Sequence, residues 1–263
     1  MKINEVIKGD CIICMRDMPN NCIDLIITDP PYGDNVVYGW NHKSIKNNEN
    51  PLINCTALVE CYRVLKKNST LYLFTNWKHY PFLTEFIQRY TKFKIRHLII
   101  WKKHNFGLGW AFRHQYEMIL VLEKGNPKYN LTNFSDVQTS SHINHTLLTH
   151  PHEKPTDLIS KMIQHSSKEG DLVLDPFCGS GAVCLACHHM QRNWIGIELE
   201  EQWVKVARWK IKDLNKIQED KKTDKYVQKR REAVKNSKTD EKIDTVLNRT
   251  YEDGFEDGSN EGD

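Results

Sequence analysis

The stretch Ile23-Asp24-Leu25-Ile26-Ile27-Thr28-Asp29-Pro30-Pro31-Tyr32 decides how the rest of this chain of 263 residues is interpreted. Its short apolar run predicts a strand that is buried on both faces of a sheet. Pro30 and Pro31 end the strand, because proline lacks a backbone N–H and fixes φ. The strand therefore brings the Asp29 carboxylate and the Tyr32 ring to its carboxyl end, which is the edge where open α/β sheets bind ligands.

Asp29 and Pro30 place two hydrogen-bond acceptors side by side. The carboxylate of Asp29 and the backbone carbonyl of Pro30 suit an –NH2 group, and the ring of Tyr32 suits a flat base. A strand that ends in an ordinary turn would explain the same residues, so the motif needs a second signal elsewhere in the chain.

That second signal is the stretch Leu172-Val173-Leu174-Asp175-Pro176-Phe177-Cys178-Gly179-Ser180-Gly181, which is again a strand that runs into a turn. Its glycines allow a ligand to approach the backbone closely, and the helix predicted over residues 182–190 offers free N–H groups to an anion. Residues 194–198 predict a further strand that ends in Glu198. An acid about 20 residues after a glycine turn suits the two hydroxyls of a ribose. Together with the strand before Asp29, this spacing is a strong indication of a ligand site.

With these motifs the chain resembles an amino-group (N6-adenine or N4-cytosine) DNA methyltransferase that uses S-adenosylmethionine. It resembles the subclass in which the DPPY motif, here Asp29–Tyr32, precedes the glycine motif, here Gly179–Gly181. The resemblance covers nearly all of residues 3–212. Further matching stretches are Gly9-Asp10-Cys11, Arg63-Val64-Leu65-Lys66, Ile100-Trp101-Lys102-Lys103 and His150-Pro151-His152-Glu153-Lys154-Pro155. His152 and Ala182 depart from the family, which usually has Thr at both positions, and both departures concern how the methionine end of the cofactor is held.

The resemblance implies a circularly permuted Rossmann-like α/β fold, in which a mixed seven-stranded sheet carries helices on both faces. We expect six parallel strands and one antiparallel strand, with the hairpin of residues 95–101 and 116–122 at one edge. Residues 1–216 would form the catalytic domain, with a short target-recognition segment at about residues 124–150.

Residues 217–263 are expected to form a charged tail. Residues 221–249 contain ten Lys or Arg and five Asp or Glu, whereas residues 250–263 contain six acids and no Lys or Arg. The basic part could follow DNA phosphates while the acidic end folds back on it in the absence of DNA. A solvated and partly disordered tail explains the composition equally well.

The resemblance also implies a role for each matching residue. The catalytic residues would be Asp29, Pro30, Pro31 and Tyr32. The cofactor-binding residues would be Asp10, Cys11, Asp29, Lys154, Asp175, Pro176, Phe177, Gly179, Ser180, Gly181 and Glu198. For Asp10, capping of a helix over residues 11–18 is an alternative that is compatible with cofactor contact.

The chemistry expected at this site is methylation of an exocyclic amine on a base that has flipped out of the duplex. Hydrogen bonds from the amine to Asp29 and Pro30 would localise the nitrogen lone pair for attack on the methyl group, while Tyr32 stacks on the base. Asp29 or solvent would take the spare proton late. No covalent intermediate with the enzyme is needed.

The segment between residues 101 and 116 mixes cations, glycines and aromatic residues, which is typical of a mobile loop that contacts nucleic acid. The predicted DNA-binding residues are Trp40, Lys102, Lys103, Arg113 and His114. The alternative for this loop is a long hairpin connection whose aromatic residues pack on the core, and for Trp40 it is a ring that fixes its own loop to the body.

Composition adds few constraints. The net charge of +3 does not by itself indicate nucleic-acid binding. Two cysteine pairs, Cys11–Cys14 and Cys184–Cys187, have the two-residue gap of zinc ligands. The first pair overlaps the expected cofactor pocket and the second lies on a predicted helix, so we expect no metal site and reduced thiols in the cytoplasm. We find no secretory signal and no apolar run of about 18 residues, so no membrane partner is expected.

The expected partners are DNA, a second copy of the chain in a homodimer and, within a restriction-modification system, a cognate restriction endonuclease. Asp at the first position of the motif mostly accompanies adenine in the family, so adenine is the expected target base. The alternatives are the N4 position of cytosine, an RNA base or a protein amide. A catalytically inactive subunit that only binds DNA is a further alternative, and it would show no affinity for S-adenosylmethionine.

Overall fold

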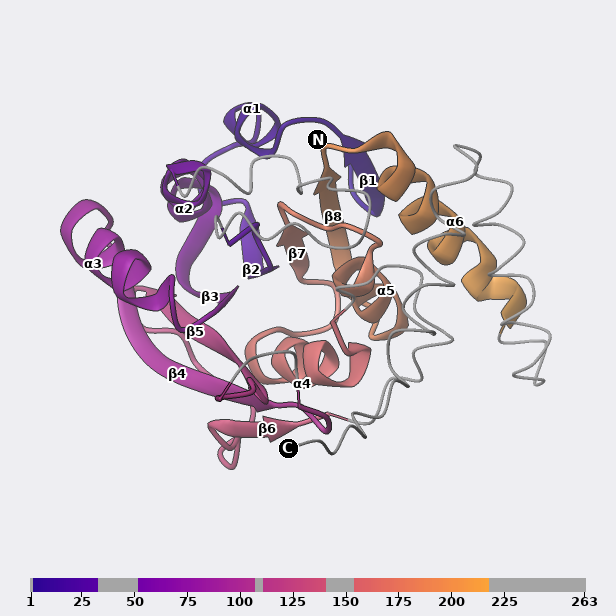
Figure 1. Ribbon diagram of the computed structural model, residues 1–263. Coiled ribbons are helices and arrows are strands. Elements are labelled where there is room, and N and C mark those ends of the chain that lie inside the picture. Colours follow the sequence, from indigo (N-terminus) through magenta and orange to yellow (C-terminus); the bar gives the residue numbers. More distant parts are fainter. Residues whose placement is uncertain (1, 33–51, 107–110, 141–153, 218–263) are drawn as a thin grey trace, which may run out of the picture.

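An eight-stranded sheet forms the centre of the computed structural model, which describes residues 2–32, 52–106, 111–140 and 154–217 (Figure 1). The strands are β1 (Glu5–Lys8), β2 (Ile23–Thr28), β3 (Leu65–Thr75), β4 (Lys94–Lys102), β5 (Tyr116–Lys124), β6 (Val137–Thr139), β7 (Leu172–Asp175) and β8 (Asn193–Glu198). Their order across the sheet is β1-β8-β7-β2-β3-β5-β4-β6. Within the described sheet, β5 alone runs antiparallel to its neighbours.

The predicted α/β class and the one antiparallel strand are confirmed, but the predicted count of seven strands is wrong. The additional strand, β6, pairs in parallel with β4, so the sheet ends at β6 and the hairpin of β4 and β5 does not lie at the edge. β6 has three residues, which is too short for an alternating pattern to show in the sequence. It lies in the polar segment that was expected to contribute to target recognition, of which residues 141–150 are outside the described part.

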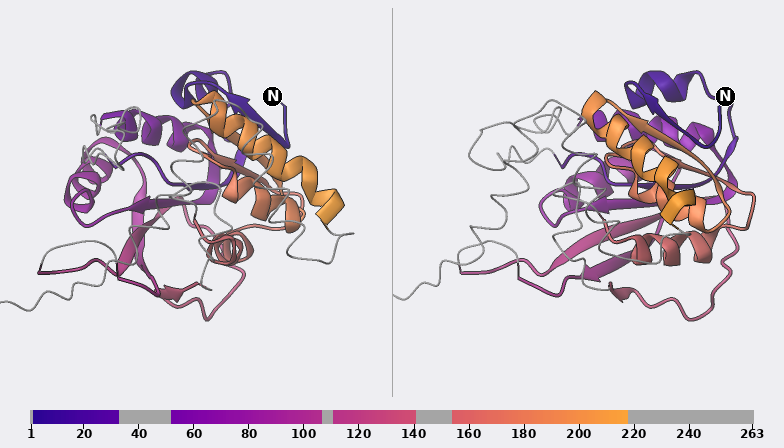
Figure 2. Two further views of the ribbon diagram at one scale, coloured as in Figure 1. Left: turned by 45° about the vertical axis from the view of Figure 1, so that its right-hand side comes forward. Right: turned by 90° about the vertical axis from the view of Figure 1, so that its right-hand side faces the viewer.

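Six helices of the described chain cover both faces of the sheet, as predicted (Figures 1 and 2). Helices α1 (Cys11–Arg16), α2 (Leu52–Val64) and α3 (Tyr80–Tyr90) contribute to the apolar cluster on one face. Helices α4 (Thr156–Ser166), α5 (Ala182–His189) and α6 (Glu201–Ile217) contribute to the cluster on the other face.

Burial on both faces explains why β2 has a continuous apolar sequence. Leu25 and Ile27 belong to the cluster under α4 and α5, whereas Ile26 belongs to the cluster under α1 and α2. Neighbouring strand residues point to opposite faces, so a strand covered on both sides needs consecutive apolar residues where it crosses the core, as at Leu25, Ile26 and Ile27. The strand is therefore held rigidly up to Thr28, the residue before Asp29.

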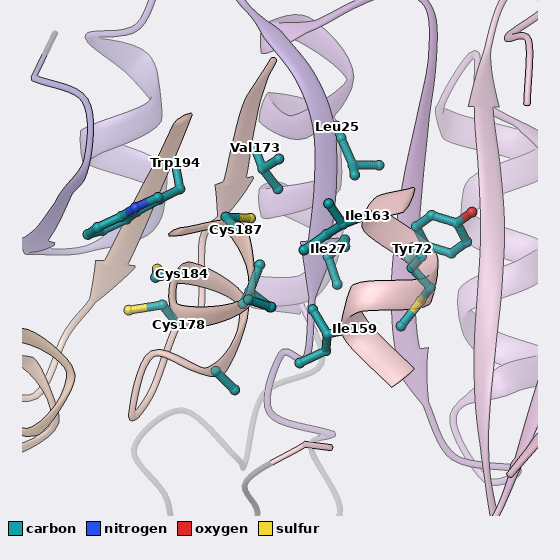
Figure 3. Packing of buried hydrophobic residues seen from close by; sticks show 14 of the residues in the cluster. Leu25, Ile27, Tyr72, Ile159, Ile163, Val173, Cys178, Cys184, Cys187 and Trp194 are labelled. Carbon is teal, nitrogen blue, oxygen red and sulfur yellow. The ribbon is translucent and has the colours of Figure 1, made fainter. Parts of the chain in front are cut away.

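Helix α4 is anchored to the same region of the sheet. Leu158, Ile159, Met162 and Ile163 are spaced along one face of the helix and are all fully buried. Figure 3 shows Ile159 and Ile163 among Ile27 and Tyr72 of the sheet. The hydroxyl of Tyr72 also lies 2.6 Å from that of Ser166 at the last turn of α4. These contacts fix the position at which α4 begins, two residues after Lys154.

The strand order places three carboxyl groups along one edge of the sheet. β8, β7 and β2 are consecutive parallel neighbours, and they end at or next to Glu198, Asp175 and Asp29. The main-chain N–H of Leu172 donates to Asp24 at the opposite end of β2 at 3.0 Å, which fixes how far β7 is shifted along β2. Within the described residues, no helix is both long enough and apolar enough to cross a membrane.

Candidate active site

Asp29 lies at the centre of the candidate site, because both of its carboxylate oxygens have partners. The hydroxyl of Tyr32 donates to Oδ1 at 2.6 Å. The ammonium of Lys154 lies 2.7 Å from Oδ2. Asn54, on α2, donates to the backbone carbonyl of Pro31 at 2.8 Å and so fixes the turn between Asp29 and Tyr32. The four residues of the motif are therefore held from both sides.

Lys154 is surrounded by acids and rings. Its side chain is 10% exposed, and its ammonium lies 2.9 Å from Oε2 of Glu117 in addition to Asp29. The same ammonium lies 5.3 Å from the ring centre of Phe74 and 5.9 Å from that of Tyr32. Burial opposes the charge on Lys154, but the two carboxylates outweigh it and raise the pKa of the ammonium above its usual value.

Glu117 was not predicted from the sequence, although it joins two lysines. Its other oxygen, Oε1, lies 2.6 Å from the ammonium of Lys103, which also lies over the ring of Trp101 at 5.3 Å. Burial favours the neutral form of Glu117, but Lys154 and Lys103 outweigh it and lower its pKa to about 2. Glu117 is the second residue of β5 and precedes its apolar run, and an acid at the start of such a strand was the signal available in the sequence.

Asp175 lies at the end of the neighbouring strand with a different environment. Its carboxyl is buried, and the main-chain N–H of Phe177 donates to Oδ1 at 3.1 Å. Burial raises the pKa of Asp175 to about 8. The negative charges of Asp29 and Glu198 also raise this pKa, whereas the hydrogen bond from the N–H of Phe177 lowers it. A cation placed near this carboxyl would favour its ionised form.

The glycine turn after β7 is tied to Glu198. One oxygen of Glu198 accepts from the main-chain N–H of Gly179 at 2.9 Å, and the other accepts from that of Glu200 at 2.8 Å. Gly179 has a φ of +49°, and a Cβ built there would meet nothing within 4 Å. The turn therefore needs glycine for its backbone conformation and leaves open space beside it.

Two other parts of the turn are packed more closely. Gly181 has a φ of +85°, and a Cβ there would lie 3.0 Å from that of Ala207 on α6. Lys210, also on α6, is fully buried and donates to the hydroxyl of Ser180 at 3.0 Å. This contact was not predicted, since a lysine on an amphipathic helix is more often exposed. Pro176 is buried and Phe177 packs partly against the cluster under α1 and α2.

Asp10 and Cys11 begin α1. One oxygen of Asp10 accepts from the main-chain N–H groups of Ile12 at 2.8 Å and Ile13 at 3.2 Å, so the capping role expected as the alternative is confirmed. Cys11 is buried in the apolar cluster, and burial together with the Asp10 charge raises the pKa of its thiol to about 12. The thiol is therefore neutral at physiological pH.

The residues predicted to bind DNA fall into three groups. Lys102, Arg113 and His114 are exposed, and β4, which ends at Lys102, runs parallel to β2 and ends at the same edge of the sheet. Lys103 is instead partly buried on Glu117. Trp40 lies outside the described residues.

Aromatic rings accompany the exposed cations. The guanidinium of Arg113 lies 5.7 Å from the ring centre of Phe106. The ring of His114 lies 6.2 Å from that of Trp77, which is half exposed just after β3. All eight cysteines are free, and the described part of the chain contains no group of three or more His, Cys, Asp or Glu residues that could hold a metal ion.

Comparison with known proteins identifies similar sequences. Residues 23–209 match the model of a protein family that is described as DNA methylase. The chain is 30% identical to the type II methyltransferase M.HpaI of Haemophilus parainfluenzae, over 79% of this chain and 74% of that protein. It is 28% identical to the DNA adenine methyltransferase YhdJ of Escherichia coli, over 77% of this chain and 80% of that protein.

Comparison with solved structures identifies the same fold. The M1.HpyAVI–SAM complex is similar with a TM-score of 0.63 and 22% identity, over 79% of this chain and 98% of that one. The PvuII DNA methyltransferase, which is cytosine-N4-specific, is similar with a TM-score of 0.68 and 16% identity, over 89% and 93% of the two chains. At these identities the likeness shows the arrangement of helices and strands.

Proposed function

The chain belongs to the DNA methylase family, and from this premise we propose that it methylates the exocyclic amino group of a flipped-out adenine in DNA. The methyl donor is S-adenosylmethionine, which when bound supplies an electrophilic methyl group on a positively charged sulfur. The observation that carries the proposal is the position of Asp29, which lies one strand away from Asp175 and the glycine turn.

Asp29 supplies the acceptor that the chemistry needs. The lone pair of an aromatic amine is delocalised into its ring, and hydrogen bonds from the N–H groups to fixed acceptors localise it on nitrogen as methyl transfer proceeds. Each carboxylate oxygen has about two acceptor sites, so Asp29 can accept from the amine while it keeps Tyr32 and Lys154. We propose that the Pro30 carbonyl is the second acceptor and that Tyr32 contacts the base.

The residues along the same edge fit a cationic nucleoside cofactor. The acids Asp175 and Glu198 favour a positive ligand, and the space beside Gly179 allows a ligand to reach the backbone. We therefore propose a cofactor pocket formed by Asp10, Cys11, Asp29, Asp175, Pro176, Phe177, Gly179, Ser180, Gly181 and Glu198. Lys154, which was expected in this set, has its ammonium on Asp29 and Glu117.

The DNA would approach the same edge. Lys102 and Arg113 are exposed cations, and Arg113 lies near the ring of Phe106, a combination that suits a phosphate backbone with unstacked bases. We propose these residues, His114 and Trp40 as DNA contacts, on a catalytic domain of residues 1–216. A homodimer, a cognate restriction endonuclease and a cytoplasmic location stay predictions.

Adenine is proposed as the target base on the identity of the first residue of the motif. Asp mostly accompanies adenine in this family, and the relative YhdJ is named a DNA adenine methyltransferase. Both bases present an –NH2 beside a ring nitrogen, so the acceptors alone do not discriminate between them.

The test is the identity of the methylated base. DNA is incubated with the purified protein and S-adenosylmethionine, digested to nucleosides and analysed by mass spectrometry. The control is the same reaction without S-adenosylmethionine. We expect N6-methyladenine. N4-methylcytosine without methyladenine would contradict the choice of base, and cofactor binding without methylation of any base would indicate the inactive DNA-binding subunit.

A further inference from the structure

Four charged side chains form a continuous chain from the DPPY motif to the end of β4. Asp29 contacts Lys154, Lys154 contacts Glu117, and Glu117 contacts Lys103, with N–O distances of 2.7, 2.9 and 2.6 Å. The two central members are the most buried, with side-chain exposures of 10% for Lys154 and 16% for Glu117. They come from the segment before α4 and from the antiparallel strand β5.

Stability alone does not account well for such a group. Taking charges out of water costs free energy that the attraction between them only partly returns, so a buried ion pair is weak evidence for stabilisation. The group does have a definite geometric effect, because it fixes the carboxylate plane of Asp29. Tyr32 holds one oxygen and Lys154 holds the other, while Glu117 and the rings of Phe74 and Tyr32 determine where the ammonium lies.

We propose that Lys154 and Glu117 are positioning residues for methyl transfer: Glu117 orients Lys154, and Lys154 holds Asp29 in the direction from which it accepts the substrate amine. This inference rests on the proposed role of Asp29. It assigns Lys154 to the catalytic carboxylate and not to the cofactor, because its ammonium lies between Asp29, at 2.7 Å, and Glu117, at 2.9 Å.

The contact between Lys154 and Glu117 has a specific consequence for the stability of variants. If Lys154 is replaced by an apolar residue, the carboxylates of Asp29 and Glu117 lose the cation between them. If Glu117 is also replaced by a neutral residue, Asp29 no longer has a second carboxylate next to it, and of the four side chains only Asp29 and Lys103 remain charged. The second substitution therefore compensates part of the destabilisation that the first one causes, which a double-mutant cycle detects.

The experiment compares Lys154→Met, Glu117→Gln and the double variant with wild type. Lys66→Met is the matched control, because Lys66 forms an ion pair of the same 2.7 Å length with Asp24 at the other end of β2. Three quantities are measured for each protein: the single-turnover rate of methyl transfer to DNA at saturating cofactor, the Kd for S-adenosylmethionine with its stoichiometry, and the Tm. Rates are expressed per bound cofactor, so that a smaller amount of folded protein does not count as a slower rate.

We expect Lys154→Met and the double variant to transfer methyl groups about 100-fold more slowly per bound cofactor, as for a misplaced catalytic group. Glu117→Gln is expected to be slower than wild type by a smaller factor, because the amide can still accept from Lys154. The Kd for S-adenosylmethionine should change little in all of them, and Lys66→Met should keep the wild-type rate. If Lys154→Met does not fold, the double variant and Glu117→Gln provide the same comparison.

Two results would overturn the inference. One is a wild-type rate per bound cofactor in both Glu117→Gln and the double variant. The other is a weakened Kd for S-adenosylmethionine with an unchanged rate at saturation, which would make Lys154 a cofactor ligand. Methyl label is counted in all bases, so methylation of cytosine would contradict the proposed target base without affecting this comparison. Wild-type protein that methylates no DNA would contradict the proposed function and this inference together.

Discussion

Both carboxylate oxygens of Asp29 have partners within the protein, and this distinguishes the proposed catalytic carboxyl from its neighbour Asp175. Asp29 has a cation and a hydroxyl as partners, whereas Asp175 has one main-chain N–H and two acids nearby. Two carboxyl groups on adjacent strands therefore have environments suited to different roles. Asp29 suits an amine, and Asp175 suits the positive charge of the cofactor.

The first prediction at the scale of single residues concerns Asp29. Asp29→Ala should lower the rate of methyl transfer by at least about 10²-fold, because it removes the acceptor that acts on the amine in the transition state. Binding of S-adenosylmethionine should survive within a few-fold, since Asp175 and the glycine turn are unchanged. Radiolabel transfer and calorimetry measure the two quantities. Near-wild-type transfer by Asp29→Ala would contradict the proposed mechanism.

The second prediction concerns the pH dependence of cofactor binding. The pKa of Asp175 is raised to about 8 in the free protein, so near pH 7 the carboxyl is mostly protonated. A cationic cofactor favours the carboxylate, and binding must then release a proton. Affinity should rise with pH and level off above about pH 8. Calorimetry in buffers of different ionisation enthalpy measures the released proton, and Asp175→Asn should abolish this contribution; an unchanged proton release in that variant would contradict the assignment.

Residue patterns in the sequence predicted much of this site but not its connections. The structure brings Asp29, Tyr32 and Lys154 together, and all three were singled out from motifs. Glu117 was missed because its two lysine partners lie far from it along the chain, and no local pattern indicates such contacts. Lys103 was predicted as a DNA contact from the composition of its loop. That composition does not show that Lys103 forms an ion pair with Glu117 on the next strand.

At the scale of elements, α4 links the apolar core to the candidate site. The helix begins at Thr156, just after Lys154, and its buried residues pack between the sheet and α5. Periodicity predicted this helix well, because four apolar residues follow one face. The strand β6 could not be predicted in the same way, since three residues carry no usable period.

A prediction for α4 is that Ile159→Ala destabilises the protein by about 2–5 kcal/mol, the range for removing a large buried aliphatic group. Chemical denaturation measures the difference in the free energy of unfolding. Val59→Ala on α2 is the control, because Val59 is 47% exposed and the substitution should change stability by less than about 0.5 kcal/mol. Equal effects of the two substitutions would show that α4 is not packed as described.

The connection between β4 and β5 gives a further prediction. Replacing Lys102 and Arg113 with Ala should weaken DNA binding and reduce the slope of log affinity against log salt by about 1 for each phosphate that the variant no longer neutralises. Lys103 is left intact, because its charge is paired with Glu117. Fluorescence anisotropy at several salt concentrations gives the slope. A slope equal to that of wild type would favour the alternative, in which this connection packs on the body without touching DNA.

At the scale of the whole molecule, the described core extends from β1 to α6. Its two apolar clusters contain described residues from Val6 to Ala207, and Ile211 packs against one of them. The order of the motifs along the chain allowed the permuted arrangement to be predicted. Sequence could not indicate where the sheet ends, because edge pairing depends on main-chain hydrogen bonds that any short segment can supply.

The corresponding prediction is that a chain ending at Ile217 still folds cooperatively and binds S-adenosylmethionine. A chain ending at Glu200 should not, because it lacks α6 with the buried Val204 and Ala207. Thermal unfolding and calorimetry compare both with the full chain. Failure of the longer truncation to bind the cofactor would show that residues 218–263 belong to the catalytic domain.

The pairing of β1 with β8 has a consequence for synthesis on the ribosome. Glu5 and Ile195 are register partners, so β1, the first strand of the described chain, joins the sheet only when β8, the last described strand, is available. Loop closure over such a separation is slow compared with the rate at which local helices form. Until β8 has left the exit tunnel, the nascent chain exposes the apolar side chain of Val6 and an unpaired strand edge. A nascent chain that ends before residue 193 therefore lacks the strand with which β1 pairs, so β1 can join the sheet only late in synthesis.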